Sequence, residues 1–135
     1  MSFEMLVAVL IGVFVVLVIA FLVVKFAPKR TKKSNFQTKW KNIIKYCAHK
    51  ETWPSALSHA DELLEEALSR RRYKGKNMGE KLVSAQKKFS DNDGVWAAHK
   101  LAVKASAHPK MRLKEKDVKV ALASIRQALK DLEVL

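Results

Sequence analysis

Five side chains in this sequence have the chemistry to ligate a metal ion or to act as a nucleophile or base. They are Cys47, His49, His59, His99 and His108. Cys47 and His49 stand two positions apart, so on a helix they point in different directions. The sequence has no His-x3-His or Cys-x2-Cys pair, whereas closed zinc sites need four convergent ligands. We therefore expect no metal site and no cofactor, and we interpret Cys47 as a small core residue.

Motifs for phosphate binding and for nucleophilic catalysis are absent from the sequence. Gly75 and Gly79 lack the Gly-Lys-Ser/Thr ending of a phosphate-binding loop, and no Ser/His/Asp elbow occurs. Four acidic residues share one side of the helix expected over 53–73. Nothing in the pattern predicts the burial that would shift their pKa values, so we interpret this side as a solvated face. These acids are Asp61, Glu62, Glu65 and Glu66.

The densest positive patch lies between residues 70 and 76. The chain of 135 residues carries 26 Lys and Arg against 13 Asp and Glu, a net charge of +13. Basic residues beside an aromatic suit contacts with a nucleic-acid backbone or another anion, although basic residues at the end of a helix followed by a solvated loop give the same pattern. The candidate anion-binding residues are Arg70, Arg71, Arg72, Lys74 and Lys76.

The elements that position these groups begin with an uncharged apolar run, Met5–Val24. As a helix this run is about 30 Å long, which matches the hydrocarbon core of a bilayer. We expect residues 1–25 to form a transmembrane anchor that spans the membrane once. The competing interpretation is a cleaved signal peptide, but the basic segment that precedes such a run and a small-residue cleavage site after it are both missing.

Basic residues follow the apolar run and none precedes it. The rule that positive charge stays inside predicts an external N-terminus and a cytosolic C-terminal domain in the cell membrane. The same residues are expected to contact anionic lipid headgroups from a juxtamembrane linker over 26–35. They are Lys25, Lys29, Arg30, Lys32 and Lys33.

A basic amphipathic helix is expected over 36–49. Its apolar stripe comprises Phe36, Trp40, Ile43, Ile44 and Cys47. Such a helix could lie on a membrane surface. We favour burial of the stripe as the first helix of a bundle, because the following segments also have single apolar faces that need partners.

Four further helices are expected, and no strand pattern is present. Their ranges are 53–73, 78–89, 95–107 and 117–132. Asn77 with Glu80 forms a helix-start signal, and Gly75 is expected to end the helix before it. The fold class is therefore all-α: one transmembrane helix and a bundle of about five helices over 36–135.

Three segments, 53–68, 73–82 and 95–101, carry a resemblance to known proteins. Over 36–135 the chain resembles small, membrane-anchored bacterial proteins of the candidate phyla radiation that are similar to HEPN domains. The resemblance implies a helical bundle that self-associates, in which an Arg and a later His form a metal-independent ribonuclease centre across a dimer. Here Ala102 and Val103 replace the family's Arg-Asn, which leaves Lys104 and His108 as the remaining candidates.

These observations favour a single-pass membrane protein that presents a basic, non-catalytic interaction domain to the cytosol, with a protein partner and a homodimer as expected associations. Lys104 lacks the planar fork with which Arg grips phosphate, which argues against catalysis. The first alternative is a membrane-tethered RNA-binding protein or HEPN-type ribonuclease that uses Arg70 to Arg72, Lys74, Lys104 and His108. The second is anionic-lipid binding by the 36–49 helix.

Overall fold

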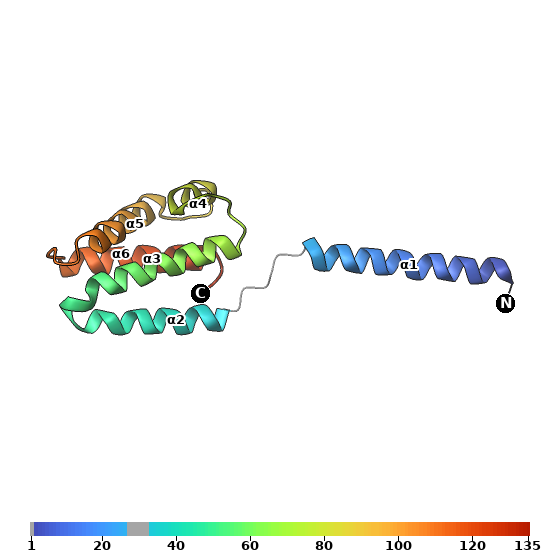
Figure 1. The fold of residues 1–135 in the computed structure, drawn as a ribbon, viewed down its shortest axis with the longest axis horizontal. Coiled ribbons are helices and arrows are strands. Elements are labelled where there is room, and N and C mark those ends of the chain that lie inside the picture. Colours follow the sequence, from blue (N-terminus) through green and yellow to red (C-terminus); the bar gives the residue numbers. More distant parts are fainter. Residues whose placement is uncertain (1, 27–32) are drawn as a thin grey trace.

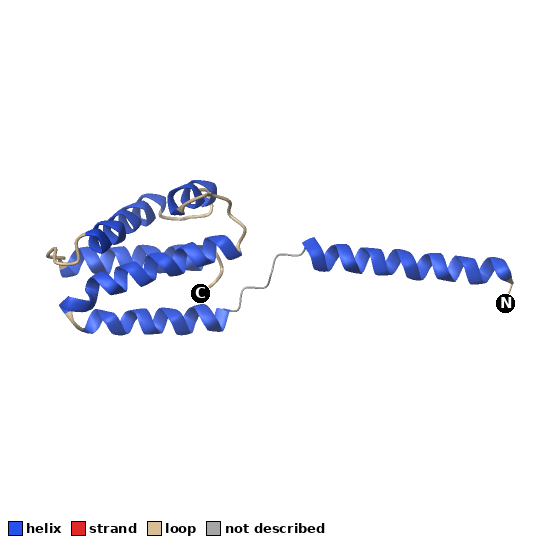
Figure 2. Cartoon of the chain, viewed as in Figure 1, coloured by secondary structure: helices blue, strands red, loops and turns tan. Residues whose placement is uncertain are grey.

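A computed structural model describes residues 2–26 and 33–135 of the chain, and within them every regular element is helical (Figure 1, Figure 2). The all-α prediction is confirmed. The α-helices are α1 (Phe3–Phe26), α2 (Lys33–Lys45), α3 (Trp53–Arg70), α4 (Met78–Ala85), α5 (Asn92–Ala107) and α6 (Glu115–Asp131). Two single-turn 3-10 helices, η1 (Tyr46–Ala48) and η2 (Lys50–Thr52), connect α2 to α3.

Helix α1 is long and apolar enough to cross a membrane, and none of its most apolar window is buried in the protein. Its apolar side chains are exposed around the whole helix, so it has no single face for packing against the bundle. A helix that is apolar all round is typical of a membrane span, because lipid replaces the missing protein contacts.

Helix α3 is the centre of the bundle and packs against α2, α4, α5 and α6. Helices α2 and α5 run antiparallel to α3, and α6 runs parallel to it (Figure 1). The core side chains of α3 follow the period expected for a helix buried along most of its length. They are Trp53, Ala56, Leu57, Ala60, Leu63, Leu64, Ala67 and Leu68.

Burial of the α2 stripe is confirmed for Phe36, Trp40 and Ile43, which all lie in the core. The apolar face of α2 therefore packs against the bundle in this fold. The predicted range 36–49 is wrong at both ends, because α2 begins at Lys33 and ends at Lys45. His49 adopts extended backbone between η1 and η2 and redirects the chain. This bend leaves Ile44 46% exposed and Cys47 only partly buried.

The end of α3 differs from the prediction. The helix ends at Arg70, and Arg72, not Gly75, adopts the left-handed conformation, with φ of 63°. Gly75 is required for another reason: a Cβ atom there would lie 2.6 Å from the backbone nitrogen of Lys81. This close approach brings the loop against the first turn of α4.

The start of α4 is capped as predicted, since Asn77 Oδ1 accepts a hydrogen bond of 2.9 Å from the Glu80 backbone N–H. Helix α4 ends at Ala85 instead of continuing to Phe89. Helices α5 and α6 begin at Asn92 and Glu115, two or three residues earlier than expected. The Asp91 side chain caps α5 by accepting a hydrogen bond from the Gly94 backbone N–H.

Candidate functional site

The acidic residues of α3 do not form the free solvated face that their spacing predicts. Asp61, Glu65 and Glu66 are each partly covered and paired with a histidine or lysine side chain from another helix. Lys81 Nζ of α4 lies 3.0 Å from Glu65 Oε1. These carboxylates therefore connect α3 to its neighbours. Glu62, at 70% side-chain exposure, is the one that matches the prediction.

The most buried of these pairs joins Asp61 of α3 to His99 of α5. His99 Nδ1 lies 2.9 Å from Asp61 Oδ1 and 3.0 Å from Asp61 Oδ2, and the two side chains are only 16% and 17% exposed. Burial raises the pKa of Asp61, and the hydrogen bond and charge of His99 oppose that rise. The His99 and Trp96 rings also meet edge-on, with 6.3 Å between their centroids.

An imidazole held by a carboxylate is also found in general-base catalysis, so the surroundings decide its role. Among the described residues, His99 contacts the Asp61 carboxylate and the Trp96 ring. The pair is a largely buried polar contact between α3 and α5.

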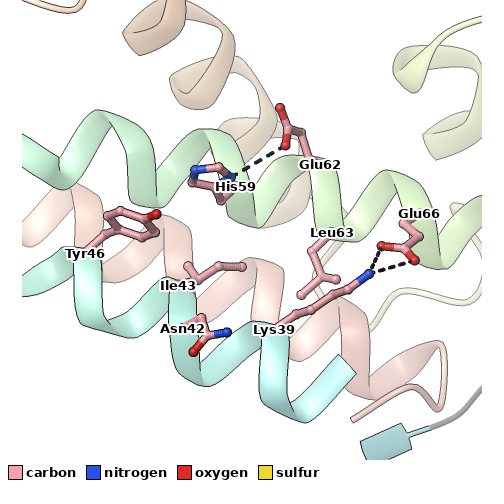
Figure 3. Close-up of a pocket in the computed structure, with 8 residues that line it drawn as sticks. All are labelled: Lys39, Asn42, Ile43, Tyr46, His59, Glu62, Leu63 and Glu66. Carbon is pink, nitrogen blue, oxygen red and sulfur yellow. Dashed lines mark hydrogen bonds and ion pairs between the residues drawn. The ribbon is translucent and has the colours of Figure 1, made fainter. Parts of the chain in front are cut away.

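A second polar region is a groove of about 300 Å³ between α2 and α3, which we call the α2–α3 groove (Figure 3). Its floor is apolar and its rim is polar. It is lined by Lys39, Asn42, Ile43, Tyr46, His59, Glu62, Leu63 and Glu66. The sequence pattern predicts no role for Asn42 or Tyr46, because neither residue belongs to the apolar stripe of α2.

The rim of the α2–α3 groove is held by two kinds of contact. Lys39 Nζ lies 2.9 Å and 3.1 Å from the two carboxylate oxygens of Glu66. His59 stacks on Tyr46, with ring centroids 5.2 Å apart, and its Nδ1 lies 3.7 Å from Glu62 Oε2. Because His59 and Glu62 are largely exposed, water screens their interaction.

The predicted anion-binding residues 70–76 divide into structural and exposed groups. Arg70 pairs with Glu66 at 3.4 Å, and Arg71 donates to the carbonyl oxygens of Leu132 and Glu133 at 2.8 Å and 2.9 Å. Arg71 thereby caps the end of α6. Lys74 and Lys76 are exposed in the loop before α4.

Lys104 and His108, the ribonuclease candidates, lie at the opposite end of the bundle. Both are exposed, and His108 terminates α5. The loop that follows borders a pocket of about 420 Å³ beside the start of α3, which we call the distal pocket. It is lined by Lys50, Glu51, Trp53, Pro54, Pro109, Lys110, Met111, Arg112 and Leu113. The fold therefore separates Arg70–Lys76 from Lys104 and His108 by the length of α3.

Positions 102 and 103, where the resemblance to HEPN domains would place Arg-Asn, differ in their surroundings. Ala102 is 2% exposed on the core side of α5, whereas Val103 is 53% exposed. A guanidinium at position 102 would replace a core methyl group, so Ala102 is part of how α5 packs.

The predicted lipid-contact residues are only partly within the described structure. Lys25 lies in the last turn of α1, with Nζ 5.8 Å from the centre of the Phe21 ring, and Lys33 is exposed at the start of α2. Lys29, Arg30 and Lys32 lie outside the described residues.

Within residues 2–26 and 33–135, no three His, Cys, Asp or Glu side chains converge as a metal site would require. Cys47 packs against the core as interpreted, and burial raises the pKa of its thiol, which disfavours the reactive thiolate. In comparisons with protein-family models, curated proteins and solved structures, no match to this chain was found.

Proposed function

We propose that this protein is a single-pass membrane protein whose basic helical bundle is a non-catalytic interaction module on the cytosolic side of the cell membrane. The observation that carries the proposal is the contrast between α1, which contacts no core, and a bundle that buries its core without α1. The anchor and the module are therefore separate units: α1 is suited to lipid and the bundle is suited to water.

The proposed orientation rests on charge. Lys25 ends α1 and Lys33 begins α2, while Glu4 is the charged residue in the first turn of α1. Cationic residues are retained on the cytosolic side during insertion. The bundle is then cytosolic and the N-terminus external.

The proposed interaction site is the distal pocket. Its lining combines three cations, Lys50, Lys110 and Arg112, and one carboxylate, Glu51, with apolar side chains that include Trp53 and Met111. Cations around an aromatic floor suit an acidic segment of a partner protein, because charge guides the encounter and the apolar contact adds affinity. The Asp61, Glu65 and Glu66 side chains of α3 are engaged with other helices and are not required for this contact.

Topology is tested with C-terminal fusions in a bacterial host. A fluorescent protein should be bright in the cytosolic position, and alkaline phosphatase, which is active only outside, should be inactive. The full-length chain should stay with membranes at alkaline pH. Recovery of a mature form cut near Ala27 would instead establish a signal peptide and end this proposal.

Partner binding is tested by crosslinking from the full-length chain in membranes. The variant Lys110→Glu/Arg112→Glu should lose the crosslinked partner, whereas Lys87→Glu/Lys88→Glu, with the same change in charge outside the distal pocket, should retain it. Equal retention by both variants would remove the distal pocket from the proposal.

A second candidate function is RNA binding or HEPN-type cleavage at the same end of the bundle. The observation that favours it is the position of the exposed His108 directly before the loop that contributes Lys110 and Arg112. In this candidate, a homodimer would supply a second copy of the same groups.

The two candidates are separated by adding RNA to the full-length protein in detergent. RNA binding should weaken steeply with salt if phosphates are the ligand. Cleavage that His108→Ala abolishes and His59→Ala leaves intact would establish the ribonuclease and overturn the non-catalytic proposal.

A further inference from the structure

The two ends of the bundle stand at different distances from the membrane anchor. Helix α1 ends at Phe26 and α2 begins at Lys33. Seven Cα–Cα steps span at most about 25 Å, so the start of α2 cannot lie farther than that from the end of α1. The far end of α2 is about 20 Å beyond, at 1.5 Å for each residue of the helix.

The start of α2 and the end of α3 lie at the same end of the bundle. Lys39 contacts Glu66 across the two antiparallel helices. From that contact, α2 runs back to Lys33 while α3 runs forward to Arg70, so both segments point the same way (Figure 1). We call this the proximal end; Lys33, Lys74 and Lys76 are among its exposed lysines.

Several carboxylates at the proximal end are already engaged, whereas the Glu133 side chain is exposed there. Glu66 binds Lys39 and Arg70, Glu80 accepts a hydrogen bond from the Lys76 backbone N–H, and Asp131 accepts from Ser90. Among the described residues, the ammonium groups of Lys33, Lys74 and Lys76 have no carboxylate partner. Their positive charge is therefore directed to solvent.

We propose that the proximal end docks on the anionic lipid of the bilayer that holds α1, through Lys33, Lys74 and Lys76. The proposal rests on the membrane anchoring proposed above. Each cation near an anionic surface favours the docked state about fivefold, so three together favour it about a hundredfold. The tether keeps these groups within reach of the headgroups, and docking leaves the distal pocket facing the cytosol.

Docking is measured with the full-length chain in lipid nanodiscs. A nitroxide is attached at Ser69→Cys, beside the proximal end, or at Glu51→Cys, beside the distal pocket, in both cases with Cys47→Ser. In discs that contain phosphatidylglycerol, the Ser69 label should be several-fold less accessible to a water-soluble nickel chelate than in phosphatidylcholine discs. The Glu51 label should be equally accessible in both.

The matched variants have equal loss of charge. Lys33→Gln/Lys74→Gln/Lys76→Gln should restore accessibility at Ser69 in anionic discs, as should high salt. Lys50→Gln/Lys110→Gln/Arg112→Gln should leave the protection unchanged. Equal accessibility in the two disc types, or equal effects of the two triple variants, would overturn docking. Failure of the anchoring itself is distinguishable, because the protein would then not purify with the discs.

Discussion

Helix α3 makes polar contacts on two sides, and they differ in how much water they retain. On the α5 side, Asp61 and His99 are both more than four-fifths covered. On the α2 side, His59 and Glu62 again combine an imidazole with a carboxylate, but these side chains are about half and more than two-thirds exposed. The comparison shows that residue type alone does not determine what a carboxylate–imidazole pair contributes. The packing of a neighbouring helix determines the contribution of the pair, because burial strengthens a satisfied contact and penalises a broken one.

The largest effect is expected from placing a charge on the covered side. Ala102→Arg would bury an unpaired guanidinium and should lower the free energy of unfolding of the bundle by about 3–5 kcal/mol. Val103→Arg, one residue away on the exposed side, should change it by less than about 0.5 kcal/mol. Tryptophan fluorescence during denaturation measures this selectively, because Trp40, Trp53 and Trp96 all lie in the bundle.

This pair of variants also tests the resemblance to HEPN domains. If arginine at 102 is tolerated as well as at 103, α5 is packed less tightly than its buried alanines indicate. A catalytic arginine would then fit the family position after all.

The next largest effect concerns the covered pair itself. Asp61→Ala removes the acceptor for His99 and should cost about 1–3 kcal/mol, because a buried donor loses its partner. The matched change Glu62→Ala should stay within about 0.5 kcal/mol. Chemical denaturation of both variants provides the comparison.

Replacement of both members of the pair sharpens the interpretation. Asp61→Leu/His99→Leu should recover much of the lost stability, since two apolar groups leave nothing unsatisfied. A double variant that is less stable than Asp61→Ala would indicate that the pair contributes more to stability than the hydrogen bond between its two members.

Measuring the stability at different pH values compares two aspartates. Burial raises the pKa of Asp61 above its usual 3.8, so its folded state binds the proton more tightly and its contribution to stability falls as pH rises from 3.8 to that higher pKa. At Asp131, burial opposes ionisation, but hydrogen bonds from Ser90 and Gln127 lower the pKa overall. Its contribution is therefore present above 3.8 and lost as pH falls through the lowered pKa.

The difference in unfolding free energy between the wild type and Asp61→Asn should thus decrease with pH across the acidic range. The difference between the wild type and Asp131→Asn should increase. If both stability differences changed with pH in the same direction, the contrast between burial at Asp61 and hydrogen bonding at Asp131 would be wrong.

The smallest effect is expected in the α2–α3 groove. A double-mutant cycle with Lys39→Gln and Glu66→Gln should give a coupling of about 0.2–1 kcal/mol that decreases with salt, as for other partly exposed ion pairs. A coupling larger than the loss in Asp61→Ala would reverse the ranking of the two sides of α3.

Periodicity predicts much of this fold because apolar spacing alone determines which face of a helix is buried. The core positions of α3 and the Asn77 cap depend only on residues within a few positions of each other. The Asp61–His99 pair depends on how α5 is placed against α3, which no local pattern contains. The sequence indicates partial burial of Asp61 only through its position, directly after the buried Ala60 on the edge of the apolar face.

The misplaced helix ends have the same origin. Ile44 and Cys47 continue the apolar stripe of α2 in the sequence. The helix ends at Lys45 and the chain turns toward α3 at His49, so Ile44 is exposed and Cys47 is only partly buried. Arg71 is a predicted anion-binding residue, but its guanidinium donates hydrogen bonds to carbonyl oxygens at the end of α6. The distal pocket is formed by residues more than fifty positions apart, which only the assembled bundle brings together.

The attachment of α2 has a mechanical consequence. The tether enters at the start of α2, and the distal pocket lies at the opposite end of the same helix. If α1 is held in a membrane and a partner is bound at that pocket, as proposed, a pulling force between them acts along the axis of α2. The buried side chains of Phe36, Trp40 and Ile43 and the Lys39–Glu66 pair then resist that force together, in shear, instead of breaking one after another.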